Sequence, residues 1–270
     1  MGKKLLAGPY LLWMVAFTVI PLALIVYYGF TGVGGGFTLA NVAAIARPEH
    51  SKALVLSLAL SMVSTVCCLV LAYPLAMVLR GRGIGKGSFI VFIFILPMWM
   101  NFLLRTMAWQ TLLEKNGVIN AFLGFFGLPK LQIMNTPAAI VLGMVYNFLP
   151  FMVLPIYNVL AKIDDDTINA AADLGANFFQ TLLRVWFPLS LPGVISGITM
   201  VFVPSLTTFV ISNLLGGSKI LLIGNVIEQE FTKSGNWHMG SGLSMVLMVF
   251  IMASMLLLAK YDRGGEGTTF

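Results

Sequence analysis

Charged side chains are scarce in this sequence. Only 10% of its 270 residues are Asp, Glu, Lys or Arg, while 59% are hydrophobic; a soluble domain is about 25% charged. Sixteen basic and ten acidic residues leave a net charge of +6, and so few charges cannot keep a chain this hydrophobic in water. The composition excludes a soluble enzyme, a disordered tail and a nucleic-acid-binding protein, whose basic residues would cluster on one polar face.

Cysteine and histidine are equally scarce. Cys67 and Cys68 are adjacent and lie inside an apolar run, so they cannot form a disulfide framework, and a zinc site needs more ligands. The two histidines, His50 and His238, are far apart in the sequence and lie in polar connections. We therefore expect no metal site and no cofactor bound by this chain.

Long apolar runs are what the sequence does contain. Each run can cross a hydrocarbon core about 30 Å thick at 1.5 Å per residue. We expect an all-α membrane protein, with residues 1–270 forming a single domain of six spans. The expected spans cover residues 8–30, 53–79, 88–113, 138–160, 189–212 and 241–259. Prolines lie inside several of them, and neighbouring helices of a bundle can satisfy the carbonyl groups that a proline leaves free, so we expect kinked helices. The first run is too long for the core of a secretory signal, so we expect it to be retained.

Lysine and arginine are denser on one set of connections than on the other. Residues 1–7, 80–87, 161–188 and 260–270 carry nine of them, whereas the longer opposite set carries six. Cytoplasmic loops are enriched in Lys and Arg, so we expect both termini in the cytoplasm. The most basic loop, Arg80–Ser88, reads RGRGIGKGS but does not fit the spacing of a phosphate-binding loop. We interpret it as a topology signal and do not expect this chain to hydrolyse ATP.

Helix signals mark the connection between the fourth and fifth spans, residues 161–188. Three successive aspartates from Asp164 favour a helix start. We expect a first helix over Thr167–Leu174, ended by Gly175 in the left-handed conformation. Asn177 then caps a second helix that runs to Phe187, before Pro188 opens the next span. Small side chains here would let another protein approach closely; the alternative is an amphipathic connector on the membrane surface.

This connection resembles a known signature. The stretch NAAADLGANFFQTLLRVWFP is similar to the EAA loop of permease subunits of ABC importers, which reads Glu-Ala-Ala, three residues, Gly, nine residues, Ile, one residue, Leu-Pro. The matching positions are Asn169, Ala170, Ala171, Gly175, Val185, Phe187 and Pro188. The resemblance implies that this loop couples the membrane part to an ATPase. Asn169 replaces the glutamate, and Asp173 is the nearest acidic group that could pair with a basic ATPase residue in its place.

The resemblance extends over the whole chain. Two stretches resemble more specifically the permeases of spermidine/putrescine importers: LLAGPYLLWMVAFTVIPLALIVYYGF and SNLLGGSKILLIGNVIEQEF. This resemblance implies the MetI-like fold of type I importers and a location in a bacterial inner membrane. It also implies that the importer works by alternating access. It also implies four kinds of partner: a homologous second permease, two cytoplasmic ATPase subunits that hold ATP and Mg²⁺, an extracytoplasmic substrate-binding protein, and the lipid bilayer.

Two other functions stay open. The chain would also suit a permease for another small solute. A stand-alone secondary transporter would usually show an acidic ion-coupling residue inside a span, or an internal repeat, and the sequence shows neither. Paired carboxylates, a histidine cluster or a Ser/His set are likewise missing from the spans, so we do not expect an enzyme.

Polar side chains inside the spans are candidates for a transport path. Asn101, Arg105 and Trp109 recur every four residues and form one stripe; Arg105 either faces the bundle or extends to the membrane interface. Ser205, Thr208 and Ser212 form another stripe, whose alternative role is hydrogen bonding between helices.

A polyamine is a flexible polycation, and it would bind to carboxylates, amide oxygens and aromatic faces. Further path candidates are therefore Tyr146, Asn147 and Asn213. Glu228 and Glu230 form an acidic pair on the outer face that would attract the cation or dock the binding protein. Because no span has a central Asp or Glu, we expect a weak, transient path and not a tight binding site.

Overall fold

The computed structural model describes residues 8–81 and 98–261, and the regular elements in these ranges are helices. Five helical stretches are long and apolar enough to cross a membrane: Gly8–Phe30, Pro48–Gly81, Pro137–Leu160, Phe178–Thr207 and Trp237–Ala259. They coincide with five of the six expected spans. Residues 88–97 of the expected third span lie outside the described residues, and helix α7 (Phe102–Leu113) covers its second part. The all-α fold is confirmed; the count of six stays a prediction.

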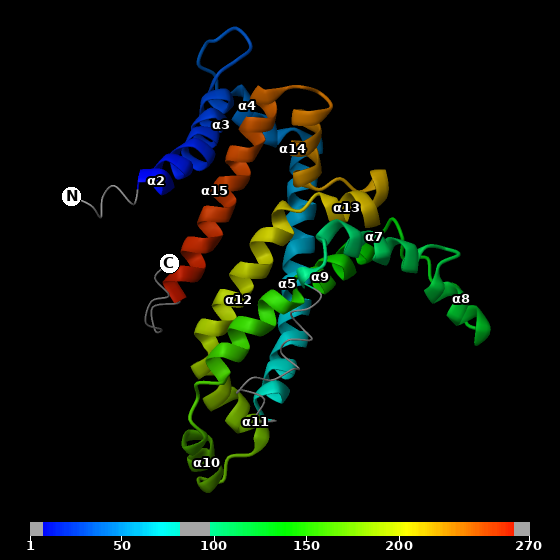
Figure 1. Ribbon diagram of the computed structural model, residues 1–270, viewed down its shortest axis with the longest axis vertical. Helices are drawn as coiled ribbons and strands as arrows, with labels where there is room; N and C mark the ends of the chain where they lie inside the picture. Colours follow the sequence, from blue (N-terminus) through cyan, green and yellow to red (C-terminus); the bar gives the residue numbers. More distant parts are fainter. Residues whose placement is uncertain (1–7, 82–97, 262–270) are drawn as a thin grey trace.

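Three long helices form the centre of the molecule. Helices α5 (Pro48–Gly81), α9 (Pro137–Leu160) and α12 (Phe187–Thr207) pack side by side (Figure 1). Glycines let α12 approach α9 closely: a Cβ atom on Gly193 would lie 2.7 Å from the carbonyl oxygen of Pro155, and one on Gly197 would lie 2.6 Å from Met152 Sδ. Small residues at such contacts are typical of membrane bundles.

Prolines lie inside all three central helices without ending them. Pro74 is inside α5, Pro150 and Pro155 are inside α9, and Pro192 and Pro204 are inside α12. Helices that continue through proline agree with the expectation for a bundle, where neighbours compensate for the lost hydrogen bonds.

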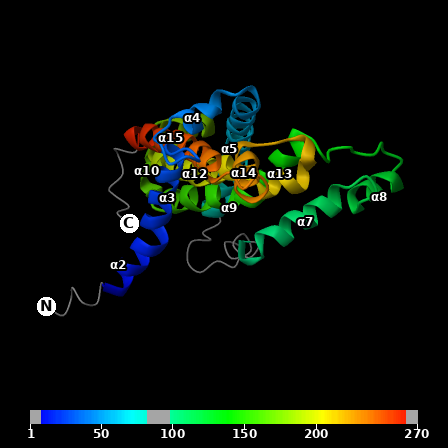
Figure 2. The same cartoon turned by 90° about the horizontal axis from the view of Figure 1, so that it is seen from above.

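The first and third spans lie outside this centre. Helices α2 (Gly8–Met14) and α3 (Ile20–Phe30), joined by a π-helical turn at Val15–Val19, form one stretch whose α3 part packs on α15 (Trp237–Tyr261). On the opposite side, α7 contacts α9 and α13 (Val210–Leu215), and α8 (Val118–Phe125) extends from it away from the bundle (Figures 1 and 2). Both arms expose large apolar side chains, as surfaces covered by lipid or another protein do.

The connections expected to be polar loops contain further short helices. Helix α4 (Ala40–Ala43) and a 3₁₀ turn at Ala44–Ala46 precede α5; α13 (Val210–Leu215), a 3₁₀ turn at Gly217–Lys219 and α14 (Ile223–Thr232) precede α15. The fifth span therefore does not continue to residue 212 as predicted. It ends at Thr207, because Thr208 adopts an extended conformation (φ −66°, ψ 137°) and the carbonyl of Phe209 accepts a hydrogen bond from Asn225.

Candidate functional site

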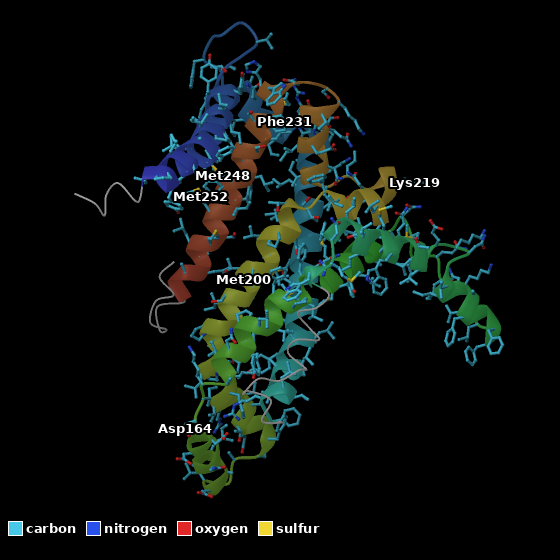
Figure 3. All side chains as sticks on the ribbon, viewed as in Figure 1. Asp164, Met200, Lys219, Phe231, Met248 and Met252 are labelled. Atoms are coloured by element: carbon cyan, nitrogen blue, oxygen red, sulfur yellow. The ribbon has the colours of Figure 1, made fainter. Side chains whose placement is uncertain are left out.

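Helix α10 (Asp165–Asp173) lies at one extremity of the molecule, beside Asp164, while Phe231 lies near the other (Figure 3). The carboxylate of Asp164 accepts a hydrogen bond from the Asp166 amide at 3.2 Å and so caps the helix. The helix begins two residues before the expected Thr167 and ends one residue before Leu174. Gly175 follows with φ +80°, so the predicted left-handed glycine is confirmed.

The second half of this connection differs from the prediction. Asn177 and Gln180 form a reciprocal capping box, so the predicted cap is confirmed. The helix that it opens does not stop at Phe187, however. Helix α11 (Phe178–Thr181), a π-helical turn at Leu182–Trp186 and α12 follow one another as one helical stretch.

The π-helical turn explains this continuity. The amide of Phe187 donates to the carbonyl of Leu182, five residues earlier, which widens the turn just before Pro188. Proline has no N–H to donate, so the helical stretch passes through Pro188 with one backbone hydrogen bond fewer. Pro188 therefore lies within a continuous helix and does not separate two elements.

The surface of this extremity combines small and large apolar side chains. Asn169, Ala170 and Asp173 are exposed and Ala171 is half-buried. The sequence analysis overlooked the larger neighbours: Leu174 is 89% exposed, and Phe178, Phe179 and Leu183 are also exposed. Phe178, Phe179 and Leu183 lie in the segment after Asn177 that the sequence predicts to be helical, and this was the available signal. An exposed apolar patch of this kind indicates a protein or membrane contact.

A second candidate site lies between α7 and α9. Arg105 is only 7% exposed, so it lies against the bundle, and its guanidinium carbon is 6.0 Å from the centre of the Tyr146 ring. Trp109 meets the same tyrosine edge-to-face, with ring centres 5.1 Å apart. The structure thus brings Arg105, Trp109 and Tyr146 together. Asn101 acts differently, because its side chain caps α7 by accepting from the amide of Leu103 at 2.8 Å.

Asn147 directly follows Tyr146 in the sequence and is fully buried. Its amide nitrogen donates to the carbonyl of Gly143 at 2.8 Å and to the hydroxyl of Thr106 at 3.5 Å, which joins α9 to α7. Within the described part of the chain, its side-chain oxygen accepts no hydrogen bond. A buried amide oxygen in this state is ready to accept from a ligand or water.

The remaining path candidates lie around the break after α12. Ser205 is fully buried, and its hydroxyl has no hydrogen-bond partner in residues 8–81 and 98–261. Thr208 is buried at the break itself. Asn213 accepts a hydrogen bond from Asn225, a buried residue that the sequence analysis missed because it lies in a segment read as a loop.

The two acidic candidates lie on α14, and both are half-buried. Glu228 accepts a hydrogen bond from the hydroxyl of Thr232 at 3.0 Å. Its side chain also lines a cavity of about 650 Å³ between α3, α14 and α15, whose walls are otherwise mostly apolar, as with Leu22, Val26 and Met248. In the described ranges, no three His, Cys, Asp or Glu residues gather to hold a metal ion.

Comparison with known proteins places these features in context. The model of a family described as binding-protein-dependent transport system inner membrane component matches residues 32–261. The spermidine/putrescine transport system permease protein PotB of Haemophilus influenzae is 37% identical over 262 residues, which cover 94% of this chain and 91% of that protein. PotB of Escherichia coli K12 is 37% identical over 254 residues, or 91% and 92% of the two chains.

The fold also matches a solved structure. In a bacterial alginate ABC transporter, crystallised with its alginate pentasaccharide-bound periplasmic protein, one chain superposes with a TM-score of 0.78 at 15% identity, covering 97% of this chain and 93% of that one. At this identity, the likeness concerns the fold alone.

Proposed function

The chain belongs to the family of inner membrane components of binding-protein-dependent transport systems, and from that premise we propose that it is a permease subunit of an ATP-driven importer for polyamines such as spermidine and putrescine. As a family member with several apolar helices, it is a multi-pass inner membrane protein. The observation that carries the proposed substrate is the 37% identity, over 94% of the chain, to a spermidine/putrescine permease.

The proposed path gives a polycation weak and successive contacts. The faces of Trp109 and Tyr146 would attract an ammonium group through cation–π interaction, and the Asn147 oxygen would accept a hydrogen bond from it. Arg105 carries the same charge sign as the cargo and opposes a tight complex. Ser205, Thr208 and Asn213 would continue the path toward the α14 end. This subunit would thus form half of the translocation path and would not contain a tight binding site.

The proposed partners meet the chain at its two ends. The α10 extremity, with Asn169, Ala170, Ala171, Asp173, Gly175 and Pro188, would seat in one of two cytoplasmic ATPase subunits, which hold ATP and Mg²⁺. This assignment puts both termini in the cytoplasm and α14 outside, where Glu228 and Glu230 would face a substrate-binding protein. A homologous second permease would complete the passage. In polyamine importers these would be the PotA-, PotD- and PotC-like subunits.

The test is ATPase activity of the reconstituted complex in the presence of the loaded binding protein. The proposal expects stimulation by spermidine or putrescine and none by small anions or by an alginate oligosaccharide. Stimulation by another class of solute would overturn the polyamine assignment and favour the permease of a different importer. Uptake driven by an ion gradient without ATPase subunits would overturn the importer itself.

A further inference from the structure

Arg80 lies in the last turn of α5, at the α10 extremity of the molecule. The sequence analysis grouped it with the basic loop Arg80–Ser88, as part of a topology signal; residues 82–88 of that loop lie outside the described residues. A topology signal needs only a positive charge near the membrane surface. The Arg80 side chain, however, is only 13% exposed, so it is turned into the protein.

The guanidinium group of Arg80 contacts four segments at once. Its Nε donates to the carbonyl of Leu160 at 2.8 Å, and its Nη2 donates to the carbonyl of Ile163 at 2.6 Å. The same Nη2 pairs with the Asp165 carboxylate at 2.8 Å. Its central carbon lies 4.4 Å from the centre of the Trp186 ring. One side chain thus joins α5 to the end of α9, the turn after it, the start of α10 and the π-helical turn before α12.

These contacts use properties that only arginine combines. Leu160 is the last residue of α9, where carbonyl groups have no partner within the helix and the helix dipole is negative. A planar fork of N–H donors can serve two carbonyl groups and a carboxylate while it stacks on an indole; a lysine ammonium cannot. Asp165 is 81% exposed, so its ion pair adds little, and the carbonyl and indole contacts matter more.

Helix α10 has few other ties to the bundle. None of its residues is buried, and Gly175, which follows it, is free of close neighbours on the side of a Cβ atom. The Arg80 hydrogen bond to the Ile163 carbonyl holds the turn that leads into α10, and the Asp165 pair adds a direct but weaker tie. Without these two contacts, α10 would be attached mainly through the flanking backbone.

We propose that Arg80 is a positioning residue that makes α10 move together with α5, α9 and α12. A displacement of α10 then reaches all three central helices, whereas a loose α10 would move alone. This inference rests on the proposed function in one respect, that the ATPases act on α10. The contacts themselves do not depend on that function.

The first measurement uses the full chain alone, in lipid nanodiscs. Spin labels at Val70 on α5 and Asp173 on α10, both exposed, report the distance between the two helices, with Cys67 and Cys68 replaced by alanine. Arg80→Gln should broaden the distance distribution about twofold, and Arg80→Lys should resemble it because the fork is lost. Arg47→Gln is the matched control: Arg47 is exposed, lies outside the 161–188 connection, and its side chain makes no hydrogen bond or ion pair among the described residues.

The second measurement uses the complex with the ATPases and the binding protein. In Arg80→Gln and Arg80→Lys, the ATPases should remain bound and hydrolyse ATP, while substrate transported per ATP falls about tenfold, as expected when coupling between two sites is lost. Arg47→Gln should transport normally. If Arg80→Gln does not insert, Arg80→Lys decides the result.

Three results would overturn the proposal. The first is an Arg80→Lys variant indistinguishable from the wild type, which would leave charge as the only requirement. The second is an Arg80→Gln variant equal to Arg47→Gln, and the third is release of the ATPases by both Arg80 variants, which would make Arg80 a docking residue. If the wild-type chain binds no ATPase, the proposed function fails, and the distance measurement still decides whether Arg80 holds α10.

Discussion

Asn225 Nδ2 donates a hydrogen bond to Asn213 Oδ1 at 2.7 Å and thereby ties α14 to α13. Asn225 is fully buried, donates also to the carbonyl of Phe209 and accepts from the amide of Leu222. A single amide side chain therefore binds the backbone carbonyl just after the break that ends α12 and the backbone amide just before α14.

Replacing Asn225 by Ala should lower the apparent melting temperature of the purified chain in detergent. The loss leaves the buried Leu222 amide without this partner, at a cost of about 1–3 kcal/mol for a buried donor left unsatisfied. The Phe209 carbonyl keeps its hydrogen bond from the Asn213 amide at 2.9 Å. Gln229→Ala, on the same helix and only half-buried, is the control and should have little effect. Equal melting temperatures for the two variants would show that the Asn225 network does not stabilise the fold.

Gly175→Val should abolish transport and release the ATPases, while the chain still inserts. Nothing lies within 4 Å of a Cβ atom at Gly175, so the effect comes from the backbone: φ is +80°, and a left-handed conformation costs a side chain about 1–2 kcal/mol. Gly175→Asn is the matched control, because asparagine tolerates this region best, and it should keep much of the activity. Co-purification of the ATPases and uptake by vesicles measure both effects; equal loss in the two variants would contradict the argument from φ.

Ala171→Trp should also release the ATPases, because a bulky side chain on this half-buried position would block the close approach of a groove. The readout is the ratio of ATPase to permease after purification. Thr167→Trp, exposed on the same helix, tests whether bulk alone is responsible. If the Ala171 variant still binds the ATPases normally, α10 is not part of the contact with them.

Leu174→Ser should weaken ATPase binding. Burial of a leucine contributes about 1.5–3 kcal/mol, so its loss should raise the dissociation constant roughly tenfold or more. Phe125→Ser is the control, since Phe125 is 85% exposed on α8 at another part of the molecule, and ATPase affinity should not change. The measurement is titration of the permease in nanodiscs with labelled ATPase.

Replacing Glu228 and Glu230 by Gln should slow polyamine uptake, and more so at low ionic strength, where charges are less screened. The control is Glu114→Gln, an exposed carboxylate before α8, which should leave the salt dependence unchanged. If the double variant takes up polyamines as fast as the wild type at both ionic strengths, Glu228 and Glu230 are solvated surface residues without a role in transport.

The local signals in the sequence predicted what depends on neighbours along the chain. The apolar runs, the glycine at 175 and the cap at Asn177 all follow from residue type and spacing. Arg105 is different: its sequence position left two orientations open, and only the packing of α7 on α9 decides that it lies beside Tyr146.

What the sequence did not predict depends on contacts between distant residues. The run around Thr208 contains Ser205 and Thr207 but is still hydrophobic enough to be read as a continuous span. The hydrogen bond that accompanies the break comes from Asn225, 16 residues beyond its acceptor. Likewise, the partners of Arg80 are at least 80 residues away. Helix α14 lies in the connection between the expected fifth and sixth spans. It was not predicted because it is too short and polar for a span, although Ile223 and Ile227 have helical spacing.

The unbroken helical stretch Phe178–Thr207 has a mechanical consequence. Its 30 residues form a rod about 45 Å long at 1.5 Å per residue, with one end on the exposed patch beside α10 and the other at the Thr208 break. Pivoted at one end, such a rod amplifies: a tilt of about 5° displaces its far end by about 4 Å over that length. A small rotation at the patch would therefore displace the Ser205 end of the stretch by more than the length of a hydrogen bond.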